Sequence, residues 1–196
     1  MTTLGFVRHG VTAWNKEGRA QGSTDIPLDE EGIQMAERTA TRLQLEEWDV
    51  LYTSPLIRAK KTADIIAEKQ SDIDFIQDNR LGEIGGGLIE GTTEDERISK
   101  WGLDWRNQDI GFEPEDVIIS RGMSFIEEVK QKHAGKRVLV VSHGGFISRL
   151  LNALVPEGKF SRDIGNTSVT IVELKDYENV CHLFNCMKHL EVEEVQ

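Results

Sequence analysis

The stretch Leu-Gly-Phe-Val-Arg-His-Gly, residues 4–10, is a short apolar run that ends abruptly in polar residues and a glycine. A run of this length before a turn signal predicts a buried strand. In open α/β sheets ligands bind just beyond the carboxyl ends of the strands, which is where Arg8 and His9 would lie. The stretch therefore predicts the first strand of such a sheet and one part of a binding crevice.

The same pattern returns at residues 137–144, where Arg-Val-Leu-Val-Val-Ser-His-Gly again places a histidine after an apolar run. If the two strands are parallel neighbours, the imidazoles of His9 and His143 project into one crevice. The segments after both strands can open helices, whose free N–H groups attract anions. Two histidines, Arg8 and exposed amides predict a phosphate pocket.

A third apolar run, residues 49–53, predicts another strand. Ser54 and Pro55 follow it and are typical of an N-cap and a first helical residue, so we expect a helix to begin there. Arg58 then lies in the first helical turn and points toward the same crevice. Taken alone, Arg58 is equally an ordinary residue on the surface of a helix.

Composition and charge narrow the class of protein. The chain has 196 residues, 38% hydrophobic and 29% charged, which is typical of one globular domain. Its net charge of −11 argues against nucleic acid or an anionic membrane surface as a partner. Without a membrane-spanning run or a signal peptide, and with Cys181 and Cys186 as free thiols, we expect a cytoplasmic protein. The sequence leaves the oligomeric state open.

The other apolar patterns complete the predicted sheet and its helices. Strands are expected near residues 73–76, 169–172 and 180–183, with helices near 29–43, 125–135 and 144–154. The glycines at 85–87 predict a loop that is either flexible or closely approached by other backbone. Trp101 and Trp105 are expected to pack within a helical excursion, and the acidic run 113–116 is expected to be a solvated loop.

Four motifs resemble the histidine phosphatase superfamily, in particular its phosphoglycerate-mutase-like branch of cofactor-independent phosphatases. They are Arg8-His9-Gly10 with Asn15 and Gln21-Gly22, residues 52–63, Leu81-x-Glu83-x-x-x-Gly87-x-x-Glu90-Gly91, and residues 141–145. The resemblance covers nearly the whole chain. It implies a three-layer α/β/α sandwich with a mostly parallel sheet, in one domain over residues 1–196 with a small cap at about 84–121.

The resemblance also implies phosphoryl transfer through a phosphohistidine. His9 would attack phosphorus, while Arg8, Arg58 and His143 would hold the equatorial oxygens. Glu83 would protonate the leaving alkoxide and then activate water. With those cations in place, we expect neither a metal nor another cofactor.

Further phosphate contacts are expected from Asn15, Gln21, Gly22, Ser23 and the Gly144 amide. Asn15 and Gln21 fit equally well as turn and capping residues. Gly85 and Gly86 stand where the family usually has bulkier residues, so the sequence leaves the rigidity of the Glu83 loop open.

A zinc site is a weaker interpretation of Cys181-His182-x-x-x-Cys186-x-x-His189. Adjacent Cys181 and His182 would point to opposite faces of a strand, so we expect packed thiols without a metal.

The predicted function is therefore hydrolysis of a small phosphorylated metabolite by a metal-independent phosphomonoesterase. A phosphoglycerate mutase is the first alternative, because it would use the same pocket. The interval between Glu83 and His143 is short, whereas the mutases of the family carry a longer insertion there. A non-catalytic protein that binds a phosphorylated ligand is the second alternative.

Overall fold

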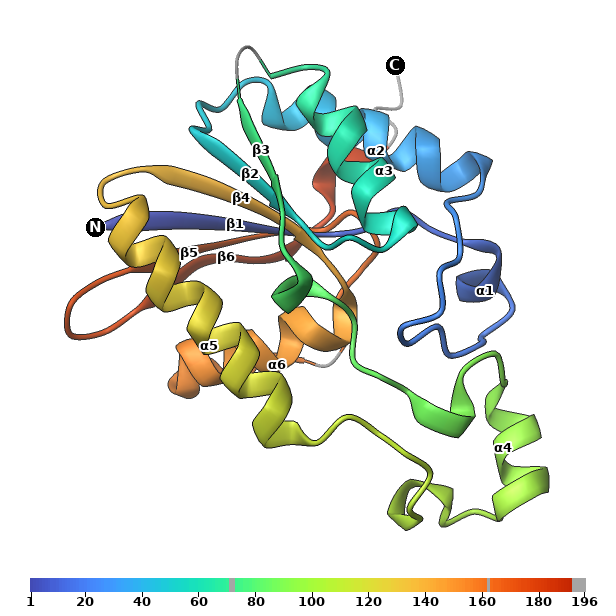
Figure 1. Cartoon of the computed structure of the whole chain (residues 1–196). Coiled ribbons are helices and arrows are strands. Elements are labelled where there is room, and N and C mark those ends of the chain that lie inside the picture. The colour runs from blue at the N-terminus through green and yellow to red at the C-terminus, as the bar shows by residue number, and fades with distance from the viewer. Residues whose placement is uncertain (71–72, 162, 192–196) are drawn as a thin grey trace.

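A computed structural model describes residues 1–70, 73–161 and 163–191 (Figure 1). Within these residues one six-stranded sheet has the order β3-β2-β4-β1-β5-β6. Strands β1 to β4 pair in parallel, while β5 is antiparallel to β1 and to β6. The mostly parallel sheet is thus confirmed. The strands are β1 (Thr2–Arg8), β2 (Val50–Thr53), β3 (Asp74–Gln77), β4 (Arg137–Ser142), β5 (Val169–Leu174) and β6 (Val180–Cys186).

The two strands that carry the histidines are parallel neighbours, which is the condition that the sequence analysis set for a shared crevice. In the register of β1 and β4, Arg8 lies opposite Ser142. The ladder continues one residue further, because the His9 amide donates to the Ser142 carbonyl at 3.0 Å. Both strands therefore end at the same edge of the sheet.

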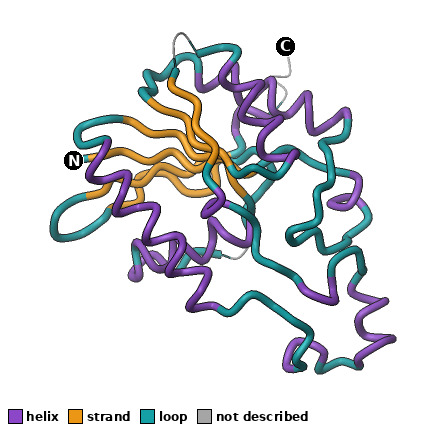
Figure 2. The backbone as a smooth tube through the Cα atoms, in the orientation of Figure 1, coloured by secondary structure: helices purple, strands orange, loops and turns teal. Residues whose placement is uncertain are grey.

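Helices cover both faces of the sheet, which confirms the three layers (Figures 1 and 2). In β4, Val138 and Val140 belong to one core cluster, while Leu139 and Val141 belong to the other. This alternation follows from the two-residue period of a strand. One face carries α2 (Glu30–Leu43) and α3 (Ile57–Ala67), the other α5 (Glu115–Lys132) and α6 (Gly144–Leu154).

The start of α3 differs from the prediction. The helix begins at Ile57 rather than Pro55, with Leu56 at the N-cap position. Ser54 is fully buried, and its hydroxyl lies 2.8 Å from the imidazole of His143. The Ser54 hydroxyl, which the sequence predicts to cap the helix, therefore contacts His143 across the sheet edge instead. Arg58 still lies in the first turn.

A small excursion between β3 and α5 carries α4 (Glu94–Trp101). Trp105 packs there with Ile89 and Ile110 in a separate cluster, with Trp101 partly buried against it. The predicted packing of the tryptophans is confirmed. Figure 1 shows this segment near α1 (Ala13–Lys16), beyond the carboxyl ends of the parallel strands.

The acidic run 113–116 is not the solvated loop that was expected. Glu115 and Asp116 form the first turn of α5, where the helix dipole favours negative charge. The Glu113 side chain is 19% exposed and pairs with Arg121 at 2.8 Å. α5 thus begins inside the interval 84–121 predicted for the cap.

No helix in the described parts of the chain combines the length and the apolar character that crossing a membrane requires.

Candidate active site

The ends of β1 and β4 bring the two motif histidines into contact. The ring centroids of His9 and His143 lie 5.2 Å apart, with the ring planes at 57°. His9 is 2% exposed and His143 is fully buried. Two imidazoles that are distant in sequence therefore share one buried site.

Both histidines are held in the neutral form. Burial lowers the pKa of His9 well below its ordinary 6.5, and the charges of Arg8 and Arg58 lower it further. Burial also lowers the pKa of His143 in the same way, with added contributions from His9 and both arginines. Neutral imidazole is the form that can act as a nucleophile.

The tautomer of His9 follows from one contact. Its Nδ1 lies 2.6 Å from the carbonyl oxygen of Gly10. A carbonyl oxygen can only accept, so Nδ1 carries the hydrogen. The lone pair of the neutral ring is then on Nε2.

Two arginines surround the histidines. Arg58 is fully buried and donates to the carbonyls of Thr24 at 2.8 Å and Gly22 at 2.7 Å. Arg8 donates to the Ile164 carbonyl. Burial lowers the pKa of both guanidiniums, and the nearby Glu83 carboxylate acts in the opposite direction.

Three buried donors of this group have no hydrogen-bond partner within the described residues. They are Nε of Arg8, Nε of Arg58 and Nδ1 of His143. An unsatisfied buried donor costs about 1–3 kcal/mol, more when charged. An anion with several acceptor oxygens, such as a phosphoryl group, offers the kind of acceptor that these nitrogens lack.

Ser54 is a site residue that sequence reasoning missed. Its hydroxyl lies 2.8 Å from Nε2 of His143 and accepts from the Leu56 amide at 3.3 Å. A hydroxyl that donates to Nε2 leaves the hydrogen of neutral His143 on Nδ1, the atom without a partner. The available signal was its position directly after β2, at the same sheet edge.

Glu83 lies at the N-terminus of α6. Its carboxylate accepts from the amides of Ile84 at 2.9 Å, Phe146 at 3.0 Å and Gly145 at 3.2 Å. A Cβ on Gly145 would come within 2.8 Å of the carboxylate, so the glycine leaves room for it. A Cβ on Gly144 would likewise stand 3.2 Å from Nε of Arg8.

Asn15 and Gln21 are tied to Thr12. The Asn15 carboxamide oxygen accepts from the Thr12 amide at 3.1 Å and completes a capping box on α1. The Gln21 oxygen lies 3.0 Å from the Thr12 hydroxyl. Asn166 links Asn15 to the His9 carbonyl, with distances of 3.4 and 3.0 Å. The capping interpretation of Asn15 is confirmed, and Asn166 connects its side chain to the His9 backbone carbonyl.

Glu90 organises the loop that contains Gly22 and Ser23. Its carboxylate accepts from the amides of Ser23 at 2.9 Å, Thr24 at 3.1 Å and Gly86 at 2.9 Å, and from both hydroxyls. The Ser23 donors thus face Glu90. Because Gly22 and Thr24 supply the carbonyls that hold Arg58, Glu90 indirectly positions that arginine. Sequence reasoning placed Glu90 in a motif and gave it no role.

The residues considered for zinc have other partners. His182 lies 3.1 Å from Glu173, while the two ring nitrogens of His189 contact Thr39 and Arg42. Across residues 1–70, 73–161 and 163–191, no group of three or more His, Cys, Asp or Glu side chains forms a potential metal site.

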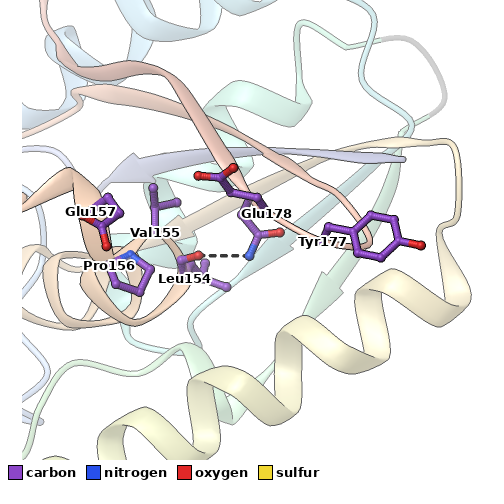
Figure 3. Close-up of a pocket in the computed structure, with 7 residues that line it drawn as sticks. Leu154, Val155, Pro156, Glu157, Tyr177 and Glu178 are labelled. Atoms are coloured by element: carbon purple, nitrogen blue, oxygen red, sulfur yellow. Dashed lines mark hydrogen bonds between the residues drawn. The ribbon is translucent and has the colours of Figure 1, made fainter.

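A surface depression lies at the opposite end of the sheet (Figure 3). Leu154 through Glu157 and Tyr177 through Asn179 line it, and Asn179 donates to the Leu154 carbonyl at 3.0 Å. Thr2, where β1 begins, pairs with Leu174 at this end, whereas His9 follows the other end of β1. The predicted site residues do not line this depression.

We predict that the free energy of unfolding decreases as the pH falls below 6.5. The unfolded histidines then take up protons that the buried His9 and His143 do not bind, and each lowers the free energy of unfolding by about 1.4 kcal/mol over the two pH units from 7.5 to 5.5. Denaturant titrations between pH 7.5 and 5.5 should show this slope, and His143→Gln should reduce it by about that amount. An equal slope in the variant would contradict the burial of a neutral His143.

We predict that Glu90→Ala weakens phosphate binding about tenfold. Without the Glu90 carboxylate the 22–24 loop is less constrained, so its carbonyls hold Arg58 less firmly. A hydrogen bond to a charged group contributes about 1.5–3 kcal/mol, so weakening the contact of Arg58 with phosphate should cost about a factor of ten in affinity. Titration calorimetry with inorganic phosphate measures this effect. Glu96→Ala is the matched control, because Glu96 pairs with Arg19 at 2.9 Å and caps α4. Equal affinities in both variants would refute the role of Glu90.

Comparison with known proteins agrees with the geometry. The family model of the histidine phosphatase superfamily (branch 1) matches residues 4–187. Phosphoserine phosphatase 1 of Hydrogenobacter thermophilus is 33% identical, with 97% of this chain and 95% of that protein covered. A 2,3-bisphosphoglycerate-dependent phosphoglycerate mutase of Gloeobacter violaceus is 34% identical over 79% of this chain and 76% of its own.

A solved structure shows the same fold with a bound ligand. It is a mutant phosphoserine phosphatase from Entamoeba histolytica in complex with phosphoserine, with a TM-score of 0.81 and 29% identity over 97% of this chain and 100% of that one. The relatives support a phosphatase of this kind and leave its substrate unspecified. Because the family match runs from the first strand to the end of the last, the resemblance is confirmed and the chain belongs to the histidine phosphatase superfamily.

Proposed function

We propose that this protein is a phosphomonoesterase that hydrolyses a small phosphorylated metabolite through a phosphohistidine on His9. One observation carries the proposal: the three buried donors of Arg8, Arg58 and His143 without partners in the described chain lie beside a neutral imidazole. This combination suits a phosphoryl group in line with a nucleophile.

In the first step Nε2 of His9 attacks phosphorus and the bond to the substrate oxygen breaks. Arg8, Arg58 and His143 hold the equatorial oxygens, and arginine's fixed donor geometry suits them. Asn15 and the Gly144 amide are proposed to add hydrogen bonds to these oxygens. Protonated Glu83 gives its hydrogen to the leaving alkoxide.

In the second step the Glu83 carboxylate takes a proton from water. The water oxygen attacks phosphorus, the bond between phosphorus and Nε2 breaks, and inorganic phosphate leaves. His9 returns to its neutral form and Glu83 to its protonated form. The guanidiniums supply the positive charge throughout, so the proposed reaction requires no metal and no cofactor.

The proposed substrate is a small metabolite, and phosphoserine is the first to test because a relative and a structural neighbour act on it or bind it. The net charge of −11 argues against nucleic acid and anionic membranes as partners. Cys181 and Cys186 are free thiols, which favours the reducing cytoplasm as the location.

We predict that His9→Ala abolishes phosphate release from p-nitrophenyl phosphate and phosphoserine with EDTA present. The physical reason is loss of the atom that accepts the phosphoryl group. Rapid quenching of the unaltered protein with labelled substrate should trap an acid-labile, alkali-stable phosphoprotein that the variant lacks. His182→Ala, which changes an exposed histidine, is the control and should keep full activity. Full activity in His9→Ala would refute the mechanism.

The mutase alternative has support from the relative in Gloeobacter violaceus. We predict that 3-phosphoglycerate, if it is accepted, yields free phosphate, because the second step transfers the phosphoryl group to water. Product analysis by NMR separates the possibilities. Formation of 2-phosphoglycerate without free phosphate would establish the mutase, and tight phosphate binding without turnover of any substrate would indicate a non-catalytic binder.

A further inference from the structure

Arg121 lies in α5, outside the four sequence motifs, yet it contacts the loop that carries Glu83. Its Nη1 donates to the carbonyls of Arg80 and Gly82, the latter at 2.9 Å, and its Nη2 lies 3.4 Å from the Glu83 carbonyl. The side chain is 18% exposed. One guanidinium therefore holds the backbone up to and including Glu83.

Glu113 extends this contact to the other side of Glu83. Its carboxylate accepts from Nε of Arg121 at 2.8 Å and from Nη2 at 3.1 Å. The same carboxylate accepts from the Gly85 amide at 3.0 Å. The pair of Arg121 and Glu113 thus fixes the backbone before and after Glu83.

The same guanidinium also packs on α6. It lies over the Phe146 ring, 4.5 Å from the ring centroid. The Phe146 amide is one of the groups that bind the Glu83 carboxylate, at 3.0 Å. Arg121 therefore contacts both the Glu83 loop and the N-terminal end of α6, whose amides bind the Glu83 carboxylate.

The donor inventory of Arg121 decides how it can act. A guanidinium has five N–H groups. Here Nε contacts Glu113, Nη1 contacts two carbonyls, and Nη2 contacts Glu113 and the Glu83 carbonyl. All five have partners in the protein, so none is left for a substrate.

We propose that Arg121, together with Glu113, is a positioning residue for the general acid Glu83. The inference rests on the proposed function, because it assigns Glu83 the proton transfers of both steps. The need for such a device follows from the sequence, where three glycines directly follow Ile84. Glycine gives the backbone extra freedom, and a displacement of about 1 Å can cost on the order of 100-fold in rate.

The test uses the dependence of the rate on the leaving group. An alkoxide leaves only with a proton, whereas p-nitrophenolate leaves without one. We expect Arg121→Gln to slow phosphoenzyme formation from phosphoserine about 30-fold and from p-nitrophenyl phosphate less than about threefold. Rapid-quench single turnovers with enzyme in excess isolate this step. Glu113→Gln should show the same pattern with smaller changes and serves if Arg121→Gln does not fold.

Arg137 provides a matched control at the other end of the sheet. It contacts a carboxylate, Glu46, at 2.9 Å and a carbonyl, Glu47, at 2.8 Å, and lies 4.4 Å from the Trp48 ring centroid. Arg137→Gln removes a similar set of contacts far from Glu83. Both substrates should react at nearly the original rate in this variant.

Glu83→Gln separates failure of this inference from failure of the proposed function. If Glu83→Gln slows both substrates equally, Glu83 is not the general acid and the proposed function is wrong in that respect. If Glu83→Gln discriminates between leaving groups while Arg121→Gln and Glu113→Gln do not, the positioning role is overturned. Discrimination in all three variants supports it.

Discussion

The parallel pairing of β1 with β4 is the constraint on which the rest of this site depends. The pairing sets Arg8 opposite Ser142, so the residues that follow, His9 and His143, emerge at one edge. At that edge His9 is 2% exposed and His143 is fully buried. Burial then decides the chemistry, because it keeps both imidazoles neutral and makes every unpaired donor costly.

The concentration of positive charge in an acidic protein follows from the same burial. Arg58 is fully buried, and within the described residues no carboxylate contacts it directly; backbone carbonyls of the 22–24 loop bind its Nη atoms. Those carbonyls accept one N–H from each terminal nitrogen, and Nε has no partner within the described residues. A carboxylate partner would have neutralised the charge that a phosphoryl group requires. The arrangement binds the arginine firmly and preserves its attraction for anions.

Two glutamate carboxylates stabilise the loops around the site by accepting hydrogen bonds from backbone amides. Glu90 joins the 22–24 loop to Gly86, and Glu113 joins α5 to Gly85. Both accept backbone N–H groups of a segment rich in glycine. Gly87 has a positive φ of 56° and lies so close to the Ile110 carbonyl that a Cβ would not fit. The glycines therefore serve close backbone approach, and the flexibility that the sequence allowed is removed by these contacts.

The sequence by itself determined the strands and the place of Arg58 in the first turn of its helix, because local periodicity and turn chemistry encode them. The parallel pairing of β1 with β4 joins segments far apart in the sequence, so the tertiary structure decided it. The family motifs also indicated Glu83. Only the tertiary structure decided that Ser54 contacts His143, that Glu115 and Asp116 begin α5, and that Glu90 and Arg121 hold the site loops. These contacts join segments about 38 to 89 residues apart. Which residues meet in these contacts depends on where each loop reaches the sheet edge, and the local sequence pattern does not predict that position.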